Sequence, residues 1–261
     1  MTEVPARREP PPFRLVTVAR VAARSASLVR VTLAGPELEG LDPGLPAASV
    51  RLLLPRAGAT EVVVPTWNGN EFLYDDGARP AIRTLTPLAF DAATLELDVE
   101  IVLHGDAPLS RWAASATPGT PAAVSGTGRG YAIDPHATSF LLAGDESAVP
   151  AIATLLPHLP AGASVRVLVE HRAEAEPVAL PDHPGATVTW CALGADEPPG
   201  AALVAAVEAE ELGPDVGVWA AGEAAAVQQI RTHLFEVVGL PRSQAVVRGY
   251  WKHGRAGAGD A

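Results

Sequence analysis

Two segments of the chain share a layout that suits an anionic cofactor, because each places a glycine and an acidic residue between an apolar run and a helical run. The residues at these two places are Gly144, Asp145, Glu146, Ser147, Gly222 and Glu223. A helix N-terminus presents backbone N–H groups and a partial positive charge, which suit a pyrophosphate or a flavin carbonyl. Asp145 or Ser147 could cap the first helix. An ordinary strand-to-helix turn is the alternative for each segment.

The C-terminal end of the chain combines aromatic and basic residues directly after an apolar run. These residues are Arg248, Tyr250, Trp251, Lys252 and His253. An aromatic ring here could cover a flavin or another flat ligand, and the basic groups could attract an anionic substrate. A solvated basic tail with an aromatic plug is the alternative.

Two segments of the N-terminal half also suit phosphate. Arg83 could bind a phosphate, and a nearby threonine, Thr84 or Thr86, could bond a flavin ring nitrogen. His104 and Gly105 precede a helix whose backbone N–H groups suit a diphosphate. The alternatives are an edge strand with a solvated arginine, and a structural histidine that bonds the local backbone. No partner lies at metal-ligand spacing from His104, so we predict no metal site.

The elements that must position these residues change character along the chain. The first half contains short, alternating, β-branched runs that Gly, Pro, Asp and Asn separate. The predicted strands are residues 13–22, 28–33, 49–54, 61–64, 81–86, 95–103 and 121–125, with a polar loop at 68–80. One helix is predicted at 109–116, with Ser110 as a possible cap. Such short strands with turns between them indicate an antiparallel barrel or sandwich.

The second half alternates apolar strands with helices. The predicted strands are residues 139–143, 165–170, 187–191, 216–221 and 245–249, and the predicted helices are 148–159, 200–212 and 223–238. This alternation indicates βαβ units and a parallel sheet, in which ligands bind beyond the carboxyl ends of the strands. We therefore predict a β-barrel domain at 13–136 and an α/β domain at 137–254, with flexible tails at 1–12 and 255–261.

Composition narrows the class of protein further. The chain has 261 residues, 48% of them hydrophobic, and a formal net charge of −11, which argues against nucleic acid as a partner. Its single cysteine, Cys191, allows no internal disulfide. No apolar stretch suits a signal peptide or a membrane span. We predict a soluble cytoplasmic protein without membrane insertion, present as a monomer or weak oligomer.

Taken in order, these segments resemble the siderophore-interacting protein family, bacterial flavin-dependent ferric-siderophore reductases. The resemblance extends from Phe13 to Gly254, and its most specific parts are residues 104–113, 144–151, 219–224 and 249–254. It implies an antiparallel barrel that binds FAD and a parallel-sheet α/β domain that resembles a nicotinamide-binding domain. The implied cofactors are FAD and NAD(P)H, and the implied partner is a ferric siderophore.

The resemblance also implies a role for each candidate residue. In such proteins an Arg-x-Tyr-Ser/Thr-x-Arg strand holds the flavin, so that Arg83 would contact the pyrophosphate and Thr86 the isoalloxazine, with Thr84 and Leu85 between them. The FAD phosphates and adenine side would be supported by His104, Gly105, Ser110, Trp112 and Ala113. The site near the flavin and the nicotinamide would be lined by Gly144, Asp145, Glu146, Ser147, Gly222 and Glu223. The flavin would be covered by Tyr250 and Trp251, and the siderophore bound by Arg248, Lys252 and His253.

The chain departs from the family strand at two positions. Leu85 stands where the tyrosine is expected and Leu88 where the second arginine is expected. Leucine can cover a ring face but cannot form the tyrosine's hydrogen bond. Loss of an arginine from a diphosphate removes a charge-assisted contact of about 1.5–3 kcal/mol, on the order of tenfold to a hundredfold in affinity. The strand therefore predicts altered or weakened FAD binding.

The leading functional prediction is a reductase that passes electrons from NAD(P)H through FAD to Fe(III) in a siderophore, which releases Fe(II). The alternatives are a non-redox small-molecule-binding protein on the same fold and a flavin reductase with another acceptor. The identity of the donor stays open between NADH, NADPH and ferredoxin. Arg172 suits the 2′-phosphate of NADPH, whereas the nearby acidic residues oppose it; they are Glu170, Glu174 and Glu176.

Overall fold

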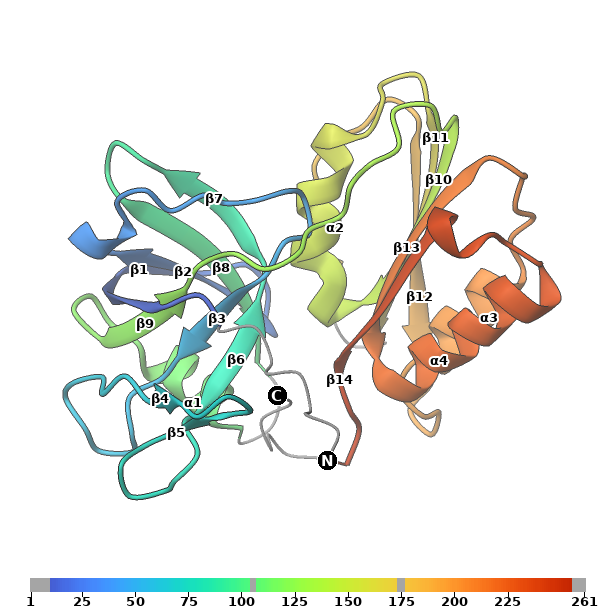
Figure 1. Ribbon diagram of the computed structural model, residues 1–261. Coiled ribbons are helices and arrows are strands. Elements are labelled where there is room, and N and C mark those ends of the chain that lie inside the picture. Colours follow the sequence, from blue (N-terminus) through green and yellow to red (C-terminus); the bar gives the residue numbers. More distant parts are fainter. Residues whose placement is uncertain (1–9, 104–106, 173–176, 255–261) are drawn as a thin grey trace, which may run out of the picture.

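The computed structural model describes residues 10–103, 107–172 and 177–254, which form two units joined by residues 126–138 (Figure 1). The predicted tails lie outside the described residues except for residues 10–12, which form no helix or strand. His104 and Gly105 lie outside them as well, as do Glu174 and Glu176. The predicted order, an antiparallel sheet followed by a parallel sheet, is confirmed.

The first unit, which we call the barrel unit, is built on a seven-stranded sheet in the order β6-β3-β9-β1-β2-β8-β7. Its strands are β1 (Phe13–Ala23), β2 (Leu28–Ala34), β3 (Val50–Leu53), β6 (Ile82–Leu85), β7 (Pro87–Asp91), β8 (Glu96–Val102) and β9 (Pro121–Ser125). All of the pairings within this sheet are antiparallel. The unit also contains the small hairpin β4 (Thr66–Trp67) and β5 (Phe72–Leu73), the 3-10 turn Pro36–Leu38 and helix α1 (Pro108–Ser115).

Alternation along the strands places one face of this sheet on a single core. On β8 the inward residues are apolar and at most 1% exposed; they are Leu97, Val99 and Ile101. They pack with the inward side chains of β1, β2, β3 and β9. Trp112 and Ala113 of α1 join the same core, so that the helix closes one end of the half-barrel. The period-two pattern that predicted these strands is thus the pattern that buries them.

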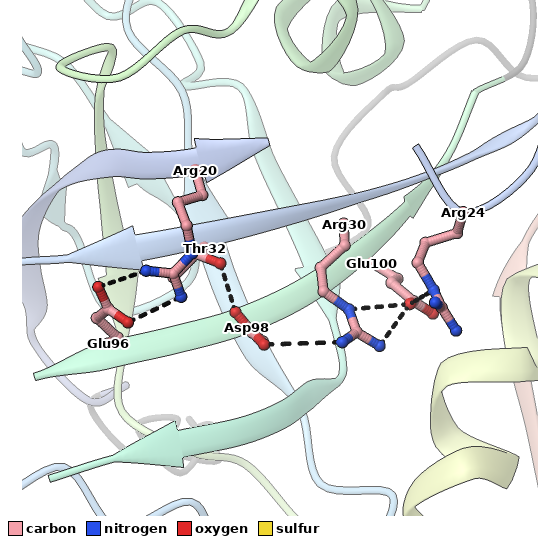
Figure 2. Close-up of polar contacts among 7 residues, drawn as sticks. All are labelled: Arg20, Arg24, Arg30, Thr32, Glu96, Asp98 and Glu100. Carbon is pink, nitrogen blue, oxygen red and sulfur yellow. Dashed lines mark hydrogen bonds and ion pairs between the residues drawn. The ribbon is translucent and has the colours of Figure 1, made fainter. Parts of the chain in front are cut away.

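The opposite face of β1, β2 and β8 is held together by charged side chains (Figure 2). Arg20 binds Glu96 through two contacts of 2.8 and 2.9 Å. Glu100 is only 5% exposed and accepts from Arg24 at 3.0 Å and Arg30 at 2.9 Å. Cross-strand pairs of opposite charge favour one register of the strands, because a slip of one residue would turn these side chains toward the core.

The second unit, the α/β unit, contains a five-stranded parallel sheet in the order β12-β11-β10-β13-β14. Its strands are β10 (Ser139–Asp145), β11 (Ser164–Arg172), β12 (Ala186–Leu193), β13 (Val216–Glu223) and β14 (Ala245–Trp251). Its helices are α2 (Val149–Leu155), α3 (Ala201–Glu208) and α4 (Ala224–Thr232), with short helical turns at Glu146–Ala148, Leu156–His158, His233–Val237 and Arg242–Gln244. Helix α2 covers one face of the sheet, and α3 and α4 cover the other (Figure 1).

Three sequence predictions of local structure were wrong, and two strands, β4 and β7, were missed. Residues 61–64 form no strand; Val63 is 60% exposed and pairs with no neighbour in the described chain. The predicted polar loop at 68–80 contains β5, and β7 was not predicted at all. Helix α1 begins after Ala107 with Pro108 in its first turn, so that Ser110 lies inside the helix and is not its cap. A β-branched run needs a neighbouring strand, and that neighbour is a tertiary property.

Helix α2 lies between the two sheets and forms part of their interface (Figure 1). The backbone N–H of Ala47, in the barrel unit, donates to the Thr154 hydroxyl of α2 at 2.9 Å. The hydroxyl of Ser27 donates to Glu146 at 3.3 Å. The units therefore meet through specific polar contacts, and that of Glu146 lies at the end of β10, where the sequence predicted a ligand site.

Candidate functional site

The site lies at the carboxyl ends of β10, β11 and β13, beside the end of β14 and the barrel-unit residue Ser27, which bonds Glu146. Each of the three parallel strands carries one acidic residue near its end. Asp145, Glu170 and Glu223 are 7%, 4% and 4% exposed. Buried carboxylates need hydrogen-bond donors, so the donors show what these residues do.

Asp145 is the centre of this network and accepts four hydrogen bonds. One carboxylate oxygen binds the backbone N–H of Ser147 at 2.9 Å and its hydroxyl at 2.5 Å. The other binds the backbone N–H of Glu223 at 2.9 Å and the indole N–H of Trp251 at 2.7 Å. Burial raises the pKa of Asp145, and the four donors oppose that shift only in part. Asp145 thus ties the end of β10 to β13 and to the end of β14.

Glu170 and Glu223 accept hydrogen bonds from the N-terminal ends of two helices of the same unit, α3 and α4. Glu170 accepts from the backbone N–H groups of Gly200 at 2.7 Å and Leu203 at 3.0 Å, at the start of α3. Glu223 is the N-cap of α4, where it accepts two backbone N–H groups, and its second oxygen accepts the N–H of His253 at 3.0 Å. Burial raises the pKa of Glu170. For Glu223 burial acts in the same direction, but the three hydrogen bonds outweigh it and lower the pKa.

The glycines at these strand ends make room for atoms of the protein itself. A Cβ on Gly144 would lie 2.3 Å from Ala148 Cβ, and one on Gly222 would lie 2.7 Å from a carboxylate oxygen of Asp145. In a dinucleotide site the corresponding space receives a diphosphate. At the starts of α3 and α4, backbone N–H groups are already bound by carboxylates, and the space beside Gly222 is filled by the carboxylate of Asp145. These two helix ends do not fit the diphosphate of NAD(P)H, and the predicted nicotinamide roles of Gly144, Gly222 and Glu223 stay predictions.

The end of β14, residues 249–253, crosses this edge of the sheet, and we call it the C-terminal strap. Gly222 pairs with Gly249 and Glu223 pairs with Trp251, so Tyr250 is an extra residue in a β-bulge. Bulges redirect side chains. The side chain of Thr86 in the barrel unit opposes in part the rise in the pKa of Tyr250 that burial causes. The Tyr250 ring meets Trp219 edge-on, with centroids 6.3 Å apart. Burial raises the pKa of Tyr250 to about 12.

On the barrel side, β6 and the residue after it present the predicted flavin strand. Arg83 is half-buried, and burial lowers the pKa of its guanidinium. Thr84 is exposed, whereas Thr86 is only 6% exposed. Leu85 packs against the barrel core. Leu88, at the position of the expected second arginine, is the extra residue of a bulge in β7.

Comparison with known proteins divides the chain in the same way, with one family model for each unit. A model of the siderophore-interacting FAD-binding domain matches residues 17–131, and a model of the siderophore-interacting protein matches residues 137–254. An uncharacterized protein of Mycobacterium tuberculosis is 39% identical over 68% of this chain and 67% of its own length. The crystal structure of a siderophore utilization protein from T. fusca has a TM-score of 0.82 and 34% identity, with coverage of 96% of this chain and 97% of its own.

The chain belongs to the siderophore-interacting protein family.

A further relative carries a name that states an activity. The ferric vibriobactin reductase ViuB of Vibrio cholerae is 26% identical to this chain, and the match covers 93% of this chain and 90% of the relative. Among the described residues, none of the helices combines the length and the apolar character that crossing a membrane requires. The same residues hold no cluster of three or more potential metal-ligating side chains.

As a siderophore-interacting protein the chain is expected to hold FAD, and the residues present fit FAD in part. Arg83 offers a half-buried positive charge beside Thr86, and an anion bound there would stabilise the charged guanidinium. The indole N–H of Trp112 is buried without a hydrogen-bond partner among the described residues, so a cofactor acceptor would satisfy it. Leu85 and Leu88 provide neither an aromatic ring nor a charge. Ser110 and Ala113 are 5% and 1% exposed, and their support of FAD stays a prediction.

The structure brings some of the predicted site residues together and places others apart from them. Asp145, Ser147, Glu223 and Trp251 share one network, and the backbone N–H of His253 joins it through Glu223. Arg248, predicted to bind substrate, instead donates to the carbonyls of Arg129 and Gly130, both at 3.1 Å. Glu146 accepts from Ser27. Lys252 and His253 are exposed on the strap.

Sequence reasoning missed one functional element of the network. Glu170 was considered only for its charge, whereas it caps a helix that begins 30 residues later. A local capping box would have left a sequence signal near the helix start, but here the cap comes from a neighbouring strand. No pattern in the chain indicates such a contact.

Proposed function

We propose that this chain is an FAD-dependent reductase of ferric siderophores that releases iron as Fe(II). The observation that carries the proposal is that the barrel unit, whose residues 17–131 match the siderophore-interacting FAD-binding domain, contacts the carboxyl end of β10 through the bond from Ser27 to Glu146 at 3.3 Å. This contact brings the FAD-binding type of unit to the carboxyl edge of the parallel sheet, which is where α/β folds bind their ligands. The name of the vibriobactin reductase, whose whole length this chain nearly spans, supports the same reaction class.

The residues of the chain would act by binding and positioning. Arg83 would hold the diphosphate of FAD, and the Thr86 hydroxyl would hold the ring. FAD, when bound, supplies the conversion between a two-electron donor and the one-electron reduction of Fe(III). Asp145 and Glu223 keep the strap in place through Trp251 and His253. The exposed groups of Lys252 and His253 would attract an anionic ferric chelate, and the iron leaves because Fe(II) binds hard oxygen ligands less tightly.

The electron donor is a separate part of the proposal. The fold favours NAD(P)H, the donor that the family resemblance implies, but the starts of α3 and α4 are bound to Glu170 and Glu223. If NADH or NADPH is the donor, its diphosphate binds away from these two helix ends. Anaerobic mixing of the flavin-loaded protein with NADH, NADPH or a reduced ferredoxin separates the three donors by which one bleaches the flavin.

The absorbance spectrum of the purified protein tests the proposed function directly. We expect a flavin spectrum, or its appearance after FAD is added, together with Fe(II) production from a ferric siderophore when the flavin is reduced. Arg83→Ala should weaken FAD binding by roughly tenfold to a hundredfold, because it removes a charge-assisted contact. Arg51→Ala, on the neighbouring strand β3, is the matched control. A colourless protein whose addition leaves FAD fluorescence unchanged would refute the reductase.

A second function is favoured by Leu85 and Leu88. Both positions lack the groups that the family strand uses on FAD, so a non-redox protein that binds a small molecule at the same place is the alternative. Such a protein would bind a ferric siderophore in equilibrium dialysis without FAD and would produce no Fe(II) when reductant is supplied. The spectrum and this dialysis experiment together distinguish the two functions.

A further inference from the structure

We propose that β12 is an edge at which a second copy of this chain pairs in the antiparallel direction, so that two five-stranded sheets join into one. The inference goes beyond the proposed function and would stand if the chain bound no flavin. Strand β12 lies at the end of the parallel sheet, and β11 is its only strand neighbour in the part of the chain that the structure describes.

The first step is that β12 has none of the features by which proteins usually protect a free edge. Its eight residues, Ala186–Leu193, contain no charged residue and no proline. Its register with β11 continues from the first pair to the last without a bulge. Charges, prolines and bulges are the usual means of keeping a free edge from pairing with another chain, so β12 is open to such pairing.

The second step is that the other edges of the two large sheets do carry such features. Strand β7 begins at Pro87, contains a bulge and ends at Asp91. Strand β14 contains Arg248 and has a bulge near its end. Strand β6 is only four residues long and includes Arg83. Of these four described edges, β12 is the one that is long, regular and uncharged, which is the combination that invites a partner strand.

The third step is that the strand matches itself. Two identical antiparallel strands are related by a two-fold axis, and an axis at Thr189 would place Val188 of each copy opposite Trp190 of the other. Val188 is 39% exposed and Trp190 is partly exposed. Aromatic and β-branched side chains that face each other stabilise an antiparallel pair, and so do opposed threonines. This register therefore provides two apolar pairs on one face and a threonine pair on the other, with no like charges opposed.

The fourth step is that the face of β12 that carries these two residues is apolar up to the edge. A cavity of about 340 Å³ lies beside the strand, and its wall includes Ala186, Val188, Trp190, Leu180 and Pro181. Leu180, Ala186 and Trp190 also pack against the core that α2 shares. The apolar surface of the core thus continues to the free edge, and a paired strand would remove part of it from water.

Sedimentation velocity of the purified protein over a range of concentrations tests the proposal. We expect a dimer with a dissociation constant on the order of micromolar, because one pair of short strands is a small interface. Each copy has a formal net charge of −11, so association should strengthen when added salt screens this repulsion. A wild-type protein that stays monomeric up to roughly 500 μM overturns the proposal.

Val188→Lys identifies the edge that pairs. It removes both apolar pairs and places a charge on the strand, so we expect association to weaken by about tenfold or more. Val237→Lys is the matched control, because Val237 is a 73% exposed valine of the same unit outside the sheet, and it should leave association unchanged. Thermal unfolding checks that both variants are folded. Equal dissociation constants for the two variants would exclude β12 as the interface.

A disulfide test determines the register and also decides if Val188→Lys does not fold. With Cys191→Ser as background, Thr189→Cys would place two thiols opposite each other at the two-fold axis, within reach of a disulfide when diamide is added. Thr187→Cys in the same background is the control, because its two thiols would lie about 13 Å apart along the strand. We expect Thr189→Cys to form the covalent dimer at least about tenfold faster. Equal rates for the two variants would refute the antiparallel pairing.

Discussion

Asp145 shows what a single side chain contributes to this site. Two of its four hydrogen bonds join the end of β10 to β13 and to the strap, so it fixes the position of Trp251. Its carboxylate also fills the space beside Gly222. Asp145 therefore acts by positioning the strap. The chemistry expected at this edge of the sheet depends on the residues of the strap that it holds in place.

Replacing Asp145 with asparagine should expose this role. The amide NH₂ would face two backbone or indole donors, so we expect the free energy of unfolding to fall by about 1–3 kcal/mol. Because burial raises the pKa of Asp145, the native state binds its proton more tightly than the unfolded chain does. The free energy of unfolding of the wild-type protein therefore falls as pH rises from the unfolded pKa of about 4 through the raised native pKa. Asp145→Asn has no carboxyl group at this position, so its free energy of unfolding does not show this fall.

The difference in free energy of unfolding between the wild-type protein and Asp145→Asn is thus expected to be largest at low pH and to become smaller as pH rises. Urea unfolding of both proteins at a series of pH values between about 4 and 8 measures it. A deficit that widens with rising pH would show that Asp145 is ionised at lower pH in the native protein than in the unfolded chain, contrary to this account.

At the scale of elements, the helix starts of the α/β unit are closed by carboxylates from strands. The start of α3 is bound by Glu170, and the start of α4 by Glu223. Negative charge at a helix N-terminus is favourable, so the two acids stabilise the helices and at the same time occupy anion sites. The parallel sheet keeps the arrangement of a nucleotide-binding fold. At two of its helix N-termini, however, the bound anion is a carboxylate of the protein, which stabilises the fold.

Glu170→Ala should therefore lower the free energy of unfolding by about 0.5–2 kcal/mol, the usual effect of losing a helix cap. Glu208→Ala, at the exposed C-terminal end of the same helix, should change it little. Thermal or urea unfolding of the two variants measures the difference. Equal stabilities of Glu170→Ala and Glu208→Ala would mean that the cap contributes nothing.

The elements themselves were largely predictable from the chain. Alternation predicted β1, β2 and β8, and the apolar runs before Gly144 and Gly222 predicted β10 and β13, because both patterns are the ones that burial requires. Residues 61–64 show the limit, since their β-branched run has no partner strand. The bond between Asp145 and Trp251 spans 106 positions, and the Tyr250 bulge depends on the register with β13. Neither leaves a local signal.

For the whole molecule, the position of one unit against the other decides whether a site exists. Helix α2 lies at the interface (Figure 1), where the Thr154 hydroxyl accepts from the backbone N–H of Ala47 in the barrel unit. Arg248 fastens β14 to the segment that joins the units, through the carbonyls of Arg129 and Gly130. The arginine predicted to bind substrate thus contributes by holding the connection between the units in one shape.

Trypsin can test this role of Arg248, because the carbonyl of Arg129 belongs to the peptide bond that trypsin would cut. Arg248→Ala should speed cleavage after Arg129 several-fold, since the connecting segment loses two hydrogen bonds and samples extended shapes more often. Mass spectrometry of timed digests measures the rate. Cleavage after other exposed arginines, such as Arg20, is the internal control, and a uniform acceleration at all sites would indicate global destabilisation instead.

The strap carries the only lysine of the 261 residues, Lys252, and this side chain is exposed. Apart from the N-terminal amine, every amine-directed dye or crosslinker will therefore attach next to Trp251. A lysine-specific protease likewise has one target, the bond to His253, whose N–H is held by Glu223. Cleavage at that single bond therefore reports whether the contact between the His253 N–H and Glu223 is kept.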